Sequence, residues 1–111
     1  MKPNSCLYRA VKEVVSYQFG VDVQPDVFDK HNAGEGIQVR DIRKCLHEAL
    51  APIGIKPVVY GVADDNEHYT GERAELSPPC VVCSREEQHA TAALPGCGKI
   101  DATFAIVFEK D

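Results

Sequence analysis

The sequence has no long run of apolar residues and no cluster of basic ones. Its apolar runs are too short for a membrane-spanning helix or for the hydrophobic region of a secretory signal. The 17 acidic residues outnumber the 12 basic residues and give a net charge of −5, and the densest basic group is Arg40, Arg43 and Lys44. A nucleic-acid-binding domain is typically much more basic. We therefore expect neither a membrane nor a nucleic acid as the partner.

The sequence also lacks the dense cysteine framework of a secreted, disulfide-rich domain. Its five cysteines are an odd number and are scattered along the chain at Cys6, Cys45, Cys80, Cys83 and Cys97. This pattern is typical of free thiols in a reducing compartment, which predicts a cytoplasmic protein. The 111 residues, 44% of them hydrophobic, suit one globular domain spanning residues 1–111, because two cores would each be too small to be stable.

Two segments have the apolar periodicity of a helix. Apolar residues between Leu7 and Val15 fall on one helical face, which predicts a helix from about Ser5 to Phe19, ended by Gly20. The same spacing recurs from Val39 to Leu50 and predicts a second helix. Residues 21–37, between the two helices, are expected to form a long surface connection with one turn near residues 26–30.

From residue 56 onward the apolar residues alternate with a period of two. This alternation predicts four strands, at Lys56–Val62, Pro79–Cys83, His89–Leu94 and Ile100–Phe108. A polar loop at residues 63–77 separates the first strand from the second. Pro95-Gly96-Cys97-Gly98 is a strong hairpin signal, so the last two strands are expected to pair with each other. The predicted class is α+β, with two helices on one side of a roughly four-stranded antiparallel sheet.

Cys6 is a candidate nucleophile because it lies where the first helix is expected to begin. The unpaired N–H groups and the dipole at that end of a helix stabilise an anion such as a thiolate, which is the reactive form of cysteine. The same N–H groups can bind the oxyanion of a tetrahedral acyl intermediate. The alternative is that Cys6 is a small core residue, which is the common situation for a free cysteine.

A nucleophilic thiol needs a base, and His89 is the histidine best placed to supply one. It follows a polar turn and opens a strand of small and apolar residues, which would hold its ring at the edge of the sheet, facing a helix N-terminus. Of the other histidines, we expect His47 on the polar face of the second helix, His31 in the surface connection and His68 in an acidic loop. An exposed strand-end histidine without a catalytic role is the alternative for His89.

The segment from Cys6 to Val11, CLYRAV, resembles the nucleophile motif of the ovarian-tumour (OTU) cysteine proteases, in which Cys-Leu-Phe/Tyr-Arg-Ala-Val/Ile opens the central helix. Residues 78–94 are similar to that family's hydrophobic strand, polar turn and histidine strand, and the stretch from His89 to Leu94 is similar to the histidine strand of papain-like proteases generally. The resemblance implies a minimal papain-like fold in which the nucleophile helix and a second helix pack on the sheet. It also implies that Cys6 and His89 act as a pair.

The chain departs from the OTU pattern around the nucleophile and after the histidine. Pro3 stands where the family has an aspartate, so the oxyanion hole would depend on the N–H of Cys6, with Asn4 as a further candidate. The group that would orient the imidazole is open, and a Cys–His dyad without a third member is one possibility. The expected hairpin would bring two acidic residues of the last strand beside His89, and the candidates are therefore Glu109, Asp111 and, more weakly, Thr91. Such a reduced site resembles those of compact viral OTU-like proteases.

Cys80, Cys83, His89 and Cys97 could alternatively form a zinc site of the form C-x2-C-x5-H-x7-C. A chelating C-x2-C pair needs a tight turn, whereas the two valines between these cysteines favour a strand. Strand alternation would send Cys80 and Cys83 to opposite faces. We therefore expect no metal and no other cofactor.

The sequence thus predicts a cysteine protease that cleaves peptide or isopeptide bonds, with Cys6 as nucleophile and His89 as proton carrier. The resemblance implies protein substrates: the C-terminus of ubiquitin or a ubiquitin-like protein, as for a deubiquitinase, or the enzyme's own polyprotein if it is viral and works in the host cytoplasm. Papain-like folds also host deamidases and acyltransferases with the same pair, which is one alternative. The other is a non-catalytic module, either zinc-stabilised or protein-binding.

Overall fold

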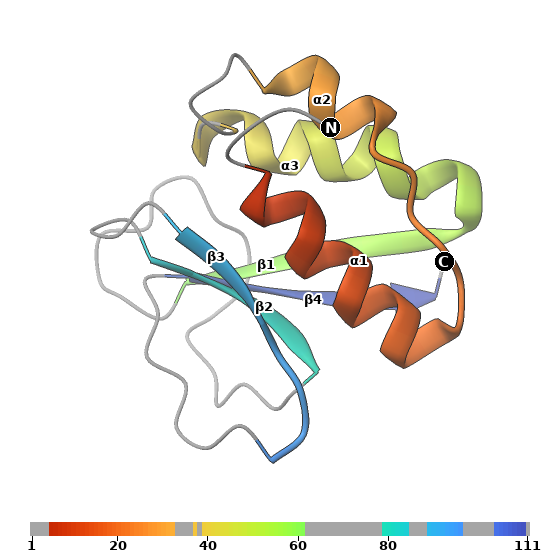
Figure 1. The fold of residues 1–111 in the computed structure, drawn as a ribbon, viewed down its shortest axis with the longest axis vertical. Coiled ribbons are helices and arrows are strands. Elements are labelled where there is room, and N and C mark those ends of the chain that lie inside the picture. Colours follow the sequence, from red (N-terminus) through yellow and green to blue (C-terminus); the bar gives the residue numbers. More distant parts are fainter. Residues whose placement is uncertain are drawn as a thin grey trace.

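The computed structural model describes residues 5–32, 37, 39–61, 79–84, 89–96 and 104–110. Its helices are α1 (Cys6–Phe19), α2 (Asp26–His31) and α3 (Val39–Leu50), followed by the 3-10 helix η1 (Ala51–Ile53). The strands β1 (Ile55–Gly61), β2 (Cys80–Ser84), β3 (His89–Ala93) and β4 (Phe104–Lys110) form one antiparallel sheet. The helices lie on one side of this sheet (Figure 1), so the predicted α+β class is confirmed. Within the described ranges no helix is long and apolar enough to pass through a bilayer.

Glycines in the left-handed conformation end α1, as predicted, and the 3-10 helix η1 that follows α3. Gly20 follows α1 with φ +70° and donates its N–H to the carbonyl of Ser16 at 3.0 Å. Gly54 closes η1 in the same left-handed conformation, with φ +73°. Glycine adopts this conformation without the steric cost that a Cβ would add, which is why it ends helices.

Helix α2 lies in the segment that was expected to be a surface connection with a single turn. Phe28 of α2 is buried, and its ring centroid lies 5.3 Å from that of Tyr8 in α1. The Tyr8 hydroxyl donates a hydrogen bond of 2.9 Å to the carbonyl oxygen of Val23. The segment is therefore held to α1 by an aromatic contact and a buried hydrogen bond, and it forms a short helix because Phe28 has a core to pack against.

The expected hairpin between the last two strands is wrong. The strand order is β1-β4-β2-β3, so β2 lies between β3 and β4. Gly96 does lie in a turn after β3, with φ +92°, but β4 pairs with β1 and β2 and not with β3. The reason is burial on both faces: in β4 the consecutive residues Ala105 and Ile106, and also Phe108, are buried, so a central position removes more apolar surface from water than an edge position.

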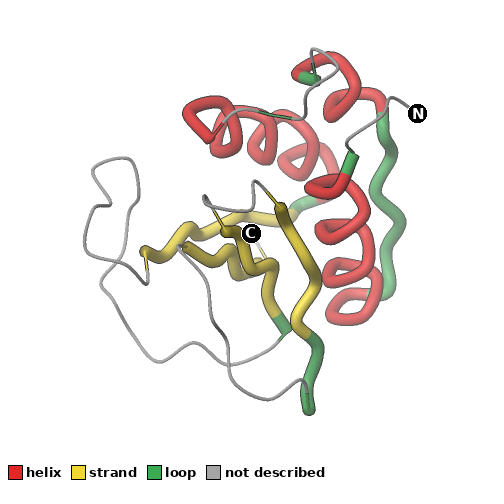
Figure 2. Tube along the Cα trace, turned by 60° about the vertical axis from the view of Figure 1, so that its left-hand side comes forward, coloured by secondary structure: helices red, strands yellow, loops and turns green. Residues whose placement is uncertain are grey.

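Alternate residues of the sheet face the helices. The register places Val59, Ile106, Val81 and Ala92 in one row across the four strands, and this row packs in or against a single buried cluster with the apolar face of α1. Helix α1 packs mainly on β3, and α3 packs on β1 (Figure 2). The next helix-facing row towards the start of β3 contains Cys83 and Ala90, which pair with each other.

Candidate functional site

Cys6 is the first residue of α1, as the sequence predicts. The first turn of α1 contains no acidic residue that would neutralise the positive end of the helix dipole. Ser5 is the N-cap residue, but its side chain makes no capping hydrogen bond; its carbonyl accepts one from the N–H of Arg9 at 3.1 Å. The thiol therefore lies beside first-turn N–H groups that the Ser5 side chain does not cap.

Burial distinguishes Cys6 from the other thiols in the described ranges. Cys6 has intermediate exposure and packs at the border of the core, whereas Cys45, Cys80 and Cys83 are buried. Burial is the main cause that raises the pKa of Cys83 to about 12, and it does the same to Cys45, with smaller contributions from the charges of Glu48 and Asp41. Cys45 is fully enclosed by the core. Of the thiols described, Cys6 is the accessible one.

Cys6 lies near the end of the sheet where β2 finishes and β3 begins. Its proximity, after burial, is a further cause of the raised pKa of Cys83 on the helix-facing side of β2. Cys83 pairs with Ala90, and the next pair in the register is Ser84 with His89. The first turn of α1 and the start of β3 lie at the same end of the molecule in both views (Figures 1 and 2). The fold thus brings the backbones of Cys6 and His89 to one end of the α1–β3 pair.

His89 is the first residue of β3, as predicted, while its side chain lies outside the described part of the structure. Ala90 and Ala92 belong to the helix-facing side of β3. Strand alternation therefore assigns backbone position 89, together with Thr91, to the opposite side. Cys6 and His89 share one end of the fold, which favours a dyad, but strand alternation does not direct position 89 towards α1. The Cys6–His89 dyad therefore stays a prediction.

The strand order corrects the role expected of Glu109. Glu109 pairs with Lys56, whereas Phe104, at the other end of β4, is the residue opposite Cys83. Five residues of extended strand span about 17 Å, so Glu109 does not lie beside His89. The expectation failed because it assumed the β3–β4 hairpin. Thr91 is exposed on β3, and an orienting role for it stays a prediction. The other two candidates, Asn4 and Asp111, lie outside the described residues, and so do His68 and Cys97.

The two cysteines of the C-x2-C segment lie on opposite faces of β2, as predicted. Cys83 belongs to the helix-facing cluster, whereas Cys80 pairs with Ala93 on the other side of the sheet. A single ion cannot be chelated by both thiols in this arrangement. In the part of the chain that the structure describes, no three His, Cys, Asp or Glu side chains are grouped to hold a metal.

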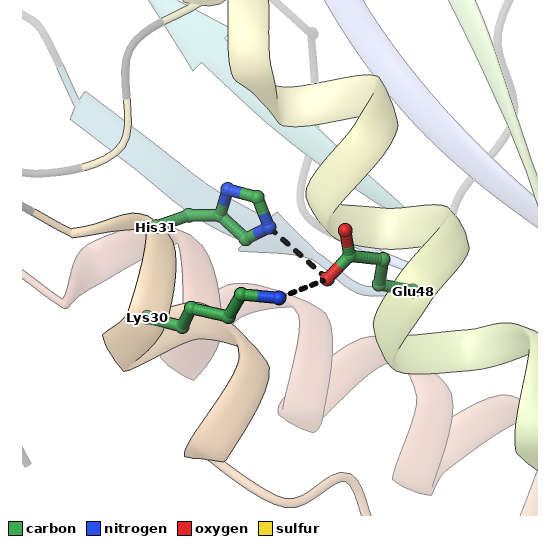
Figure 3. Close-up of polar contacts among 3 residues, drawn as sticks. All are labelled: Lys30, His31 and Glu48. Carbon is green, nitrogen blue, oxygen red and sulfur yellow. Dashed lines mark hydrogen bonds and ion pairs between the residues drawn. The ribbon is translucent and has the colours of Figure 1, made fainter.

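A polar cluster of Lys30, His31 and Glu48 joins α2 to α3 and was missed in the sequence (Figure 3). The Oε2 atom of Glu48 lies 3.3 Å from Nε2 of His31 and 3.3 Å from Nζ of Lys30. The hydrogen bond with His31, and then that with Lys30, lowers the pKa of the Glu48 carboxyl. The signal was hidden because residues 26–31 were expected to be a connection, so no partner helix was available to pair with Glu48.

The fold and the site define a small α+β domain with one accessible thiol, among those described, at the amino end of its first helix. Comparisons with protein-family models, with curated proteins and with solved structures find no match to this chain. Its function is therefore inferred from the residues themselves.

Proposed function

We propose that this chain is a cysteine protease that cleaves peptide or isopeptide bonds, with Cys6 as its nucleophile. The observation that carries the proposal is that, among the described thiols, Cys6 alone escapes burial, and it also opens a helix. The positive end of α1 and its first-turn N–H groups stabilise the oxyanion that forms in the attack. The resemblance of residues 6–11 to the OTU nucleophile motif supports the same residue.

In the proposed reaction the Cys6 thiolate attacks the carbonyl carbon of the scissile bond. His89 accepts the thiol proton and later gives it to the leaving amine. Ala90 and Ala92 belong to the helix-facing side of β3, and His89 is the first residue of that strand. The substrates that the resemblance suggests are the C-terminus of ubiquitin or of a ubiquitin-like protein and, for a viral enzyme, its own polyprotein.

A ubiquitin probe with a thiol-reactive group at its C-terminus tests the deubiquitinase form of the proposal. The wild type should form a covalent adduct, Cys6→Ala should form none, and His89→Gln should react far more slowly. Cys45→Ala is the matched control, because it removes a buried thiol and should leave adduct formation intact. A wild type without adduct, or an adduct that survives Cys6→Ala, contradicts this form of the proposal.

Product analysis on a labelled peptide or ubiquitin conjugate then identifies the reaction. A protease releases a new amino terminus or a lysine side chain at the cleaved bond. Ammonia release with the chain intact would indicate a deamidase instead.

A further inference from the structure

We propose that the hydroxyl of Ser5 is a catalytic hydrogen-bond donor to the oxyanion that forms when Cys6 attacks its substrate. This inference rests on the proposed function and names a further residue of the same site. Ser5 directly precedes Cys6 and is buried, with 8% of its surface exposed. The inference rests on a buried hydroxyl that has no hydrogen-bond partner among the described residues, next to the accessible thiol and the amino end of α1.

Ser5 occupies the N-cap position but does not cap the helix. The side chain of an N-cap serine usually accepts a hydrogen bond from the second or third N–H of the helix. Ser5 makes no such bond, and its backbone, with φ −94° and ψ 32°, is outside the extended region that capping residues usually adopt. The hydroxyl is therefore not committed to the stability of α1.

The burial of Ser5 makes its unpaired hydroxyl informative. Two polar residues are buried in the described ranges, Ser5 and Asn32, and Asn32 does have an interaction partner. The Ser5 hydroxyl makes no hydrogen bond among the described residues. Buried polar groups are hydrogen-bonded in the great majority of cases, and leaving one unpaired is unfavourable. An acceptor that arrives with the substrate supplies the missing partner.

The chemistry at Cys6 creates such an acceptor. When the thiolate forms a bond to the carbonyl carbon, the π electrons of the carbonyl move onto its oxygen, which becomes an oxyanion. The Ser5 O–H donates a hydrogen bond to that oxygen and keeps its proton, alongside the first-turn N–H groups of α1. The oxyanion then collapses, the carbon–nitrogen bond breaks, and the amine leaves with the proton from the base. The hydroxyl thus gains its partner in the tetrahedral state.

The experiment compares Ser5→Ala with the wild type in three measurements. For hydrolysis of a fluorogenic amide at the ubiquitin C-terminus, kcat should fall about 100- to 1,000-fold, as expected for one oxyanion donor, while KM changes little. Alkylation of Cys6 by iodoacetamide, which forms no oxyanion, should proceed at the wild-type rate. The melting temperature should stay the same or rise, because alanine removes an unpaired buried hydroxyl. Ser16→Ala is the matched control, since it removes an exposed hydroxyl from the same helix and should change none of these quantities.

The possible outcomes separate this inference from the proposed function. Equal kcat values for Ser5→Ala and the wild type overturn the role of Ser5 and leave Cys6 as the nucleophile. A lower melting temperature together with slower alkylation shows that Ser5 is a structural cap, which also overturns the inference. A wild type that hydrolyses neither the ubiquitin amide nor a peptide removes the proposed function and the role of Ser5 with it.

Discussion

Brief alkylation of the folded protein with iodoacetamide at pH 8 should modify Cys6 and leave Cys45 and Cys83 intact. The reagent reacts with the thiolate form. With a pKa raised to about 12, roughly one in 10,000 molecules of each buried thiol is ionised at pH 8, against about one in ten at the ordinary value of 9.0. Burial therefore slows the reaction about 1,000-fold through ionisation alone.

Access adds a second factor. Cys45 is 0% exposed and Cys83 is 5% exposed, so the reagent reaches them mainly in molecules that have opened. For a free energy of unfolding of about 5 kcal/mol, at the low end for small domains, only about one molecule in 5,000 is open at any moment. Reaction in the closed molecule is limited by ionisation and reaction in an opened molecule by the rarity of opening, so either route predicts labelling of Cys6 at least about 100-fold faster than labelling of either buried thiol.

Timed quenching followed by peptide mass spectrometry measures each cysteine separately, and the urea-unfolded protein gives the reference rates. In the unfolded chain the thiols should react at similar rates. The reasoning is refuted if Cys45 or Cys83 reacts within tenfold of Cys6 while circular dichroism shows that the protein is still folded. In that case the selection of Cys6 by burial, on which the proposed function depends, is wrong.

Three further changes test the packing around the site. Tyr8→Phe removes the buried hydrogen bond to Val23 and should lower the free energy of unfolding by about 1 kcal/mol in urea titrations; an unchanged midpoint would contradict this. Gly20→Ala meets no neighbouring atom but places a Cβ at φ +70°, so it should cost about 1 kcal/mol of backbone strain, and an equal stability would show that the cap tolerates alanine. Glu48→Gln should lower the melting temperature at pH 7. Because the fold lowers the pKa of Glu48, its stabilisation is present above the unfolded value of 4.5 and is lost as the pH falls through the lowered pKa. The melting temperatures of Glu48→Gln and the wild type should therefore converge towards pH 3, and a constant difference would rule this out.

Features of the fold that depend on local signals were predicted from the sequence. The bounds of α1 and α3 follow from helical periodicity, and Gly20 marks the end of α1; each of these signals is local to the helix it marks. The strands β1, β2 and β3 were placed within one residue at most positions, because alternation is also a local property. The opposite orientation of Cys80 and Cys83 follows from the same rule.

The strand order was not predictable in the same way. The turn signal after residue 94 is real at Gly96, but a turn does not determine which strand becomes the neighbour. That choice depends on the total apolar surface buried when β4 enters the centre of the sheet, which involves β1 residues 43 to 55 positions away. The misplacement of Glu109 was a direct result, and α2 was missed for a similar reason, since Phe28 is ordered by its contact with Tyr8 in another helix.

In the candidate site, too, the local features were predicted from the sequence and those that depend on distant packing were not. The place of Cys6 at a helix start is local and was found, whereas the complete burial of Cys45 depends on the packing of the whole core. The unused hydroxyl of Ser5 could not be read from the sequence, because serine before a helix normally predicts a cap. The absence of a side-chain capping hydrogen bond and the backbone conformation at Ser5 both show that the cap is not made.

The central place of β4 has a consequence for synthesis on the ribosome. β1 and β2 share no hydrogen bonds with each other, and the strand that joins them is the last of the four to be translated. A nascent chain that has not yet reached residue 104 therefore carries an unpaired β1 and a separate β2–β3 pair with open edges, which are vulnerable to wrong pairing. Their union must be a late step that involves nearly the whole polypeptide, so the domain cannot mature progressively from its amino terminus.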